Sequence, residues 1–106
     1  DELIGLNDIT VDNVADHLLR LSADHRRTGH VYTLHAELEG MKLAPVFEKL
    51  LAGWRAAGHE LLTLRDYCAA FDAGALPRHE VNDGEIPGRS GTLSLQGEEF
   101  LADAAP

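Results

Sequence analysis

The chain has 106 residues, of which 44% are apolar and 25% charged, and its formal net charge is −9. This length suffices for one small hydrophobic core, but not for a large two-layer enzyme with a deep cleft. The negative charge disfavours binding to nucleic acid or to anionic lipid, because both repel an acidic surface. With Cys68 as its single cysteine, the chain can form no internal disulfide.

Helices and strands are predicted to alternate through the first 72 residues. Apolar side chains recur with helical spacing in three segments, and two short apolar or β-branched runs lie between those segments. The predicted elements are a helix over residues 10–28, a strand over 30–36, a loop over 37–42, a helix over 43–57, a strand over 60–64 and a helix over 65–72. Such alternation is typical of α/β proteins with parallel strands.

The composition changes after residue 74, where Pro77, Pro87 and several glycines interrupt the chain. Proline and glycine favour turns, so this region is predicted to consist mainly of loops, with one further strand over residues 92–95. The prediction therefore divides the chain into residues 1–74, with regular secondary structure, and a loop-rich extension over residues 75–106.

Three side chains in the first part are predicted to be structural. Tyr32 and Trp54 lie at spacings typical of core residues, so packing is their expected role. Cys68 has no histidine near it in the sequence, which favours a small buried residue over a nucleophile.

Residues 31–40 carry the most specific motif of the chain, VYTLHAELEG. An apolar strand that ends in Leu-His resembles the last motif of the polysaccharide deacetylase (NodB-homology) family. Within that family the run resembles the branch of 4-deoxy-4-formamido-L-arabinose-phosphoundecaprenol deformylases. Residues 1–5 and 86–93 are similar to that branch as well, and residues 62–67 match the usual family ending.

The resemblance implies a fold and an activity for a longer parent protein. The family fold is a distorted (β/α) barrel, and this chain would be its C-terminal third, with residues 1–74 as β/α units of the barrel. The implied reaction is metal-dependent hydrolysis of an amide on an N-acylated amino sugar, specifically N-deformylation of a lipid-linked 4-formamido-arabinose. The implied location is cytoplasmic, at the inner face of the bacterial inner membrane.

The same resemblance assigns candidate roles within the motif. His35 would be the general acid, a task that suits an imidazole because it titrates near neutrality. Leu34 would line the pocket for the acyl group, or be a core residue, or both. Glu37 and Glu39 could each bind a substrate hydroxyl or cap the loop, and the sequence leaves both alternatives open.

No metal ligand is predicted in this chain. The divalent metal of the family is held by an aspartate and two histidines from upstream motifs, and those motifs are not present here. Without those motifs the chain is expected to be inactive alone. It also opens with Asp-Glu rather than Met, so it is expected to be a fragment. The alternative is a non-catalytic interaction module, or a fragment that self-associates through the exposed edge of the strand over residues 30–36.

Overall fold

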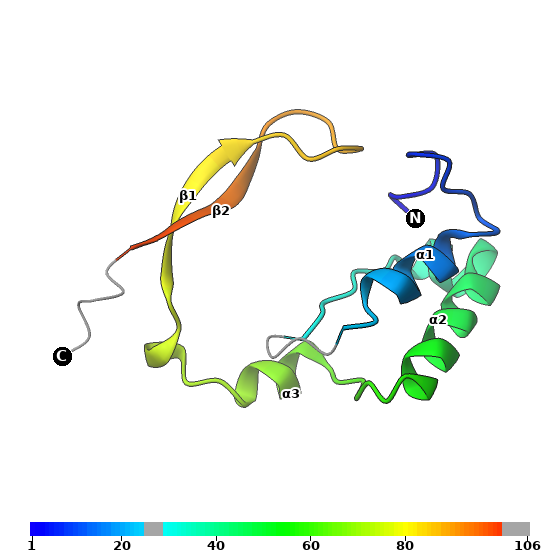
Figure 1. Cartoon of the computed structure of the whole chain (residues 1–106), viewed down its shortest axis with the longest axis horizontal. Helices are drawn as coiled ribbons and strands as arrows, with labels where there is room; N and C mark the ends of the chain where they lie inside the picture. The colour runs from blue at the N-terminus through cyan, green and yellow to red at the C-terminus, as the bar shows by residue number, and fades with distance from the viewer. Residues whose placement is uncertain (25–28, 101–106) are drawn as a thin grey trace. The chain divides into compact units, whose positions relative to one another are not determined.

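The computed structural model describes residues 1–24 and 29–100, and the chain divides into two units, Asp1–Leu61 and Leu62–Pro106 (Figure 1). The first unit contains two packed helices and a short helical turn, and the second contains a helix followed by a β-hairpin. The boundary between the units lies at residue 61. The division at residue 74 came from composition and family resemblance, and it stays a prediction.

The first helix, α1 (Val14–Leu21), is shorter than the predicted helix over residues 10–28. Residues 11–13 form a turn ahead of it, in which the backbone nitrogen of Val14 donates to the carbonyl of Thr10 at 2.9 Å and the side chain of Asn13 accepts from the backbone nitrogen of Thr10. The helix ends where the hydroxyl of Ser22 donates to the carbonyl of Leu18 at 2.8 Å, which competes with continuation of the helix. Residues 25–28 of the predicted helix lie outside the described residues.

The second helix, α2 (Ala44–Ala56), agrees with the predicted helix over residues 43–57 to within one residue at each end. Pro45 is tolerated in its first turn, where a backbone donor would have no helical partner. Gly58 follows the helix with a φ of +83°, a left-handed conformation that glycine adopts without strain. Periodicity and end signals were therefore sufficient to locate this helix.

The core of the first unit lies between α1 and α2. Gly53 allows a close approach of the two helices, because a Cβ atom at this position would lie 2.6 Å from Cδ2 of Leu19. Leu50 has no exposed surface. The buried apolar residues of the described chain are Ile9, Val14, Ala15, Leu43 and Leu50.

Tyr32 packs against α2, which confirms the packing role predicted for it and for Trp54. Its ring centroid lies 6.3 Å from that of Phe47 in a stacked arrangement, and 5.3 Å from that of Trp54 in an edge-on arrangement. The indole nitrogen of Trp54 donates to the hydroxyl of Ser22 at 2.8 Å, which links α2 to the end of α1. These contacts fix the chain against α2 three residues ahead of His35.

The two strands predicted over residues 30–36 and 60–64 are not formed among the described residues. A β-strand needs a hydrogen-bonded neighbour, and neither segment pairs with another part of the described chain. Residues 30–35 are extended, and Val31 is 67% exposed. Pairing of these segments with strands of a larger barrel stays an expectation from the family resemblance.

The second unit begins with α3 (Leu64–Ala69), which overlaps the predicted helix over residues 65–72. Thr63 caps this helix, because its hydroxyl oxygen accepts a hydrogen bond from the backbone nitrogen of Asp66. Cys68 is exposed on α3, so the prediction that it is buried was wrong. The helix has six residues, and none of them is buried.

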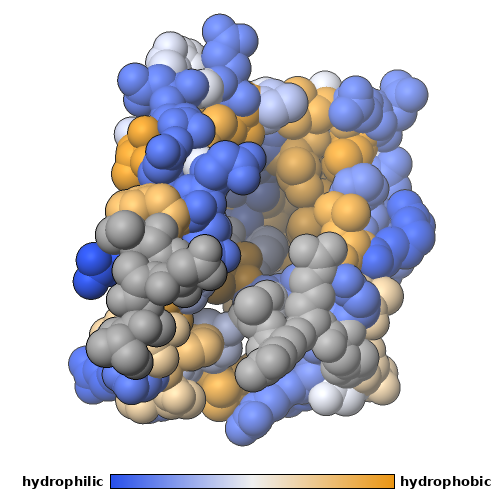
Figure 2. Space-filling model, turned by 60° about the vertical axis from the view of Figure 1, so that its left-hand side comes forward, coloured by the Kyte–Doolittle hydropathy of each residue, from blue (hydrophilic) through white to orange (hydrophobic). Residues whose placement is uncertain are grey.

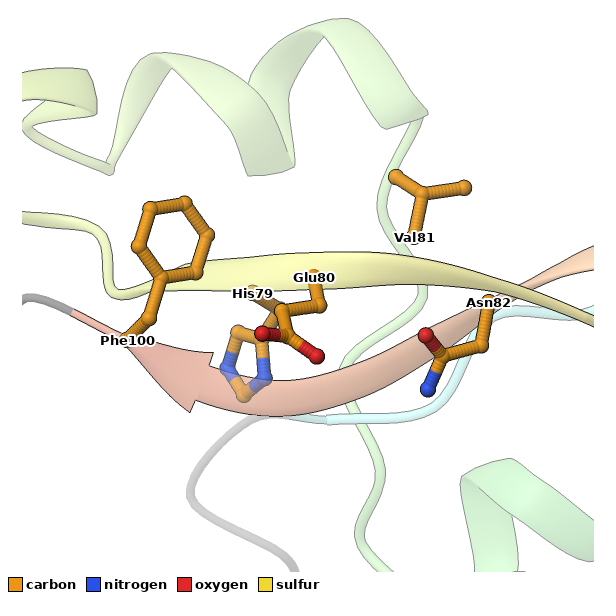
Figure 3. Close-up of a pocket in the computed structure, with 5 residues that line it drawn as sticks. All are labelled: His79, Glu80, Val81, Asn82 and Phe100. Atoms are coloured by element: carbon orange, nitrogen blue, oxygen red, sulfur yellow. The ribbon is translucent and has the colours of Figure 1, made fainter.

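A β-hairpin occupies the region that was predicted to be mostly loop. Strands β1 (Arg78–Gly84) and β2 (Leu93–Phe100) pair antiparallel, with an irregularity in register between His79 and Val81. In Figure 3, Val81 and Phe100 project to one side of the strands, and His79 and Asn82 project to the other. Most of the glycines that suggested loops, and Pro87, lie in the connection between the strands or at strand ends. The strands themselves contain many charged residues, which are not typical of β-strands.

Many large apolar side chains remain exposed on both units (Figure 2). None of the described helices combines the length and the apolar character needed to cross a membrane. The most exposed members of this set, each above 50%, are Leu21, Val31, Met41, Leu62, Leu64, Leu76 and Val81.

Leu50 should contribute more to the stability of the first unit than any exposed leucine. Leu50→Ala should lower the free energy of unfolding by about 2–5 kcal/mol, because it removes a fully buried side chain and leaves a cavity. Urea denaturation followed by the fluorescence of Trp54, the one tryptophan of the chain, measures this directly. Leu21→Ala is the matched control, since Leu21 is 58% exposed, and it should change stability by no more than about 0.5 kcal/mol. Equal losses in the two variants would contradict the placement of the core.

Candidate active site

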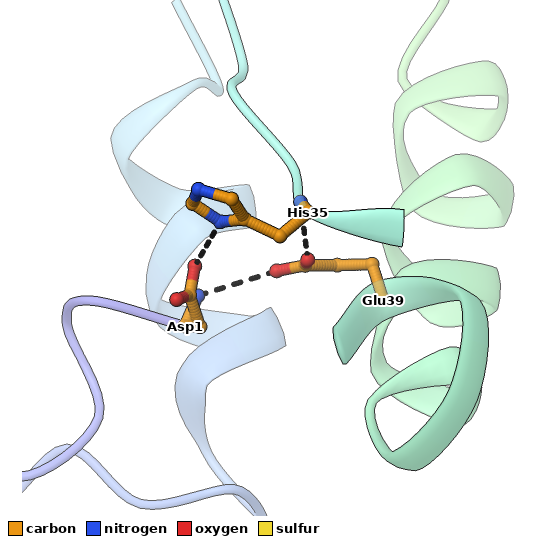
Figure 4. Close-up of polar contacts among 3 residues, drawn as sticks. All are labelled: Asp1, His35 and Glu39. Atoms are coloured by element: carbon orange, nitrogen blue, oxygen red, sulfur yellow. Dashed lines mark hydrogen bonds and ion pairs between the residues drawn. The ribbon is translucent and has the colours of Figure 1, made fainter. Parts of the chain in front are cut away.

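His35 ends the extended segment that Tyr32 holds against α2. Its side chain is 44% exposed, and its ring nitrogen Nδ1 lies 3.3 Å from Oδ1 of Asp1. The second ring nitrogen, Nε2, points away from the neighbouring carboxylates (Figure 4). The imidazole is thus held on one side by an acceptor and left open on the other, which is the arrangement of an oriented acid or base.

The turn after His35 is helical, so the loop predicted over residues 37–42 is corrected. The carbonyl of His35 accepts hydrogen bonds from the backbone nitrogens of Leu38 and Glu39, each at 2.9 Å. A π-helical turn, η1 (Leu38–Lys42), follows and is closed by a 2.7 Å bond from the nitrogen of Leu43 to the carbonyl of Leu38. Gly40 and the glutamates favoured a loop in the sequence, but these backbone bonds outweigh that preference.

Glu39 is a buried carboxylate directly beneath His35, with 2% of the residue exposed. Its Oε2 accepts from the backbone nitrogen of His35 at 2.8 Å, and its Oε1 accepts from the amino nitrogen of Asp1 at 3.3 Å (Figure 4). Burial raises the pKa of Glu39, but the hydrogen bonds from backbone nitrogens and the charge of the Asp1 amino group outweigh burial and leave the pKa below its ordinary value. Glu39 is therefore ionised at neutral pH.

Tyr32 completes the surroundings of Glu39 through a side-chain hydrogen bond to its carboxylate. Burial, the negative charge of Glu39 and this hydrogen bond raise the pKa of the Tyr32 phenol, in that order of importance. The phenol therefore keeps its proton and acts as a donor to Glu39.

The residues predicted from the motif are not all brought together. His35 and Glu39 are in contact through the backbone of His35, whereas Leu34 is 42% exposed and outside the core, and Glu37 is exposed. The contacts of Glu39 correspond to the loop-capping alternative that the sequence left open. Substrate contacts of Leu34, Glu37 and Glu39 stay predictions.

The motif did not single out Asp1 or the polar role of Tyr32. Asp1 lies 34 residues from His35, and no periodic pattern connects positions so far apart. Tyr32 was interpreted as a packing residue, which is correct for its ring but leaves out its hydroxyl. The similarity of residues 1–5 to the deformylase branch was the one available signal for Asp1.

Asp1, His35 and Glu39 are also the one group of potential metal ligands found in the described part of the chain, with one ligand atom each within 4.8 Å of the others. Both oxygens of Glu39 and the Nδ1 of His35 already lie in hydrogen bonds or ion pairs. The group also differs from the aspartate and two histidines that the family resemblance implies. These residues therefore do not fit the expected metal site.

Comparison with known proteins identifies relatives among deformylases. The chain is 32% identical over 96 residues to a probable 4-deoxy-4-formamido-L-arabinose-phosphoundecaprenol deformylase, ArnD, of Shewanella sediminis. The aligned region covers 91% of this chain and 30% of the relative. It is 36% identical over 66 residues to a probable deformylase of the same name from Wigglesworthia glossinidia brevipalpis, which covers 62% of this chain and 23% of the relative. No family model and no solved structure matches the chain.

These relatives are both named as probable deformylases, and the chain spans less than a third of the length of each. The similarity suggests that the chain is related to part of a deformylase. It extends over most of the chain and therefore includes more than the short motif around His35.

Glu39 should make stability depend on pH in the acidic range. Because its folded pKa lies below the ordinary value of 4.5, its contribution is present above that pH and is lost as pH falls through the folded pKa. Glu39→Gln should lower the free energy of unfolding at pH 7 by about 1–3 kcal/mol, since buried donors lose their acceptor. The difference from the wild type should shrink as the pH falls through the folded pKa, because the wild-type carboxylate then becomes protonated and loses its charge.

Urea denaturation at a series of pH values from 7 downward measures this difference, with Glu48→Gln as the control. Glu48 is exposed on α2, so the same change of charge there should have little effect at any of these pH values. A difference between Glu39→Gln and the wild type that stays constant until the wild type unfolds in acid would contradict ionisation as its origin.

Proposed function

We propose that this chain is the C-terminal part of a metal-dependent amide hydrolase, a deformylase or deacetylase that acts on an N-acylated amino sugar. The observation that carries the proposal is the geometry of His35, whose Nδ1 faces the carboxylate of Asp1 at 3.3 Å while Nε2 remains open. The two deformylase relatives support the same reaction class. The proposed substrate is a lipid-linked 4-formamido-arabinose, and the proposed location is the cytoplasmic face of the membrane that carries it.

His35 would supply the proton that the departing amine requires. An amine is a poor leaving group until its nitrogen is protonated, so the proton on Nε2 of the imidazolium passes to that nitrogen as the C–N bond breaks. The pair of electrons of that bond stays on the amine nitrogen. The ring is left neutral with its remaining proton on Nδ1, where the carboxylate of Asp1 accepts a hydrogen bond from it.

The divalent metal belongs to the rest of the proposed enzyme. Its expected ligands, one aspartate and two histidines, would come from residues outside this chain, because the described residues do not fit that set. We therefore propose that the 106-residue chain alone has no hydrolase activity. Its own contribution to the parent site would be the proton donor and the groups that orient it.

Removal of His35 tests the proposal in the full-length protein that contains this segment. His35→Ala should lower kcat by about 10²–10⁴, the usual cost of losing a general acid, and metal content should stay near that of the wild type. Asp1→Asn should lower kcat in the same direction, because the amide cannot stabilise the imidazolium with a negative charge. Steady-state kinetics and metal analysis of the purified variants provide the measurement.

His17→Gln on α1 is the control for replacing a histidine outside the site, and its kcat should equal that of the wild type. Loss of the metal from His35→Ala, in proportion to the loss of activity, would make His35 a ligand and contradict its role as the acid. A kcat within a few-fold of the wild type would contradict the function itself.

A second candidate, a self-associating interaction module, is favoured by the hairpin of the second unit. The sheet has two strands, so among the described residues each strand has one unpaired edge. Val81 is 76% exposed on β1. An unpaired edge with exposed apolar side chains favours pairing with another chain. The strand over residues 30–36, which the sequence predicted as the site of pairing, is not formed here.

If the hairpin is the site of self-association, the chain should form dimers or larger species in solution. Val81→Lys should shift it toward the monomer, because a lysine on an exposed strand opposes edge-to-edge pairing. Light scattering coupled to size-exclusion chromatography, over a range of concentrations, distinguishes these outcomes. A monomer at high concentration would exclude the module.

A further inference from the structure

One buried carboxylate connects the backbone of His35 to the group that holds its ring. Glu39 accepts from the backbone nitrogen of His35 through Oε2 and from the amino nitrogen of Asp1 through Oε1, and Asp1 in turn faces the ring of His35 (Figure 4). We propose that Glu39 is a positioning residue, which sets the orientation of His35 without touching the substrate. This inference rests on the proposed function of His35 as the proton donor.

The hydrogen bonds of Glu39 explain why a carboxylate is required at this position. Three donors converge on it: the backbone nitrogen of His35, the amino nitrogen of Asp1 and the phenol of Tyr32. An ionised carboxylate has two oxygens with about four acceptor sites and no donor, so it can satisfy all of them. In the proposed longer protein, the nitrogen of Asp1 would be a backbone N–H, which would donate to Oε1 of Glu39 as the amino group does here. A glutamine would turn its NH2 group toward one or more of these donors and leave them unsatisfied.

The same contacts restrict the movement of His35 at both ends. Its carbonyl is held by the nitrogens of Leu38 and Glu39, each at 2.9 Å, and its own nitrogen is held by the Glu39 side chain at 2.8 Å. This reciprocal bonding resembles a helix capping box, in which a glutamate reaches back to the first backbone nitrogen of the turn. The start of the side chain is therefore fixed, while Asp1 orients its ring.

The burial of Glu39 supports a positioning role rather than a contact with substrate. The side chain is 1% exposed, whereas that of His35 is 44% exposed. A change at Glu39 should therefore alter the chemical step through the geometry of His35, and leave substrate affinity nearly unchanged. A displacement of a reacting group by about 1 Å can lower the reaction rate about 10²-fold.

The test compares Glu39→Gln with Glu48→Gln in the full-length protein that contains this segment. Glu39→Gln should lower kcat by about 10- to 100-fold with KM within about twofold of the wild type, as expected for misplacement of a catalytic group. Glu48→Gln, which makes the same chemical change at an exposed position of α2, should leave both constants unchanged. Tyr32→Phe removes one of the three donors and should have a smaller effect on kcat.

A second measurement on the 106-residue chain separates positioning from general destabilisation. In amide hydrogen exchange, Glu39→Gln should speed the exchange of the His35 amide by about 10-fold or more, because that amide loses its acceptor. The amide of Leu50 in α2 reports the loss of global stability expected for this variant, so it should speed up by a smaller factor than the amide of His35. Faster exchange of both amides by the same factor would assign Glu39 a purely structural role and overturn the inference.

The kinetic results also separate this inference from the proposed function. If His35→Ala lowers kcat but Glu39→Gln does not, the positioning role is wrong and the proposed function stands. If His35→Ala leaves kcat unchanged, the proposed function fails and the inference fails with it. A rise in KM with constant kcat in Glu39→Gln would instead make Glu39 a substrate-binding residue and overturn the inference.

Discussion

The arrangement around His35 depends on the burial of a single negative charge. A carboxylate in the interior of a protein is unfavourable unless donors replace the water that it loses. At Glu39 those donors come from three residues: Asp1 at the start of the first unit, and Tyr32 and His35 in the segment before η1. Ionisation of Glu39 therefore requires all three to be in place at once, and the charge in turn keeps them together.

The helices of the first unit provide the frame that makes this burial possible. Tyr32 contacts two aromatic residues of α2, and Trp54 is hydrogen-bonded to Ser22 at the end of α1. The aromatic contacts hold the ring of Tyr32 while its hydroxyl reaches Glu39. Core packing thus determines where the polar network is built, and the polar network determines how His35 is presented.

The sequence predicted the features that depend on neighbouring residues. The bounds of α2 follow from apolar periodicity, Pro45 and Gly58, all of which are local signals. The strands over residues 30–36 and 60–64 were predicted from composition alone, but a strand also needs a partner, and the described chain provides none. One strand of the hairpin was predicted in part, since the predicted strand over residues 92–95 overlaps β2. Strand β1 was missed, because its charged residues give little sign of a strand although pairing with β2 stabilises it.

The site was predictable in part. The motif made His35 the candidate general acid, a role that stays a prediction, and the sequence allowed either a substrate contact or a cap at Glu39. The choice between these two roles depends on whether the Glu39 side chain is buried, and a sequence of alternating acidic and apolar residues does not reveal this. The contact of Asp1 with His35 joins residues 34 positions apart, so only a three-dimensional structure reveals the carboxylate next to the ring of His35.

The central claim is that the carboxylate of Asp1 orients the ring of His35 and leaves Nε2 available to donate. The most direct measurement is nitrogen-15 NMR of the His35 imidazole in the 106-residue chain, with the ring neutral. The protonated ring nitrogen is the one that donates to a hydrogen-bond acceptor, so the tautomer shows which nitrogen faces Asp1. The account predicts that the proton of His35 resides on Nδ1 in the wild type, and that Asp1→Ala abolishes this preference. A ring protonated on Nε2 in the wild type, or a tautomer that does not respond to Asp1→Ala, would contradict it.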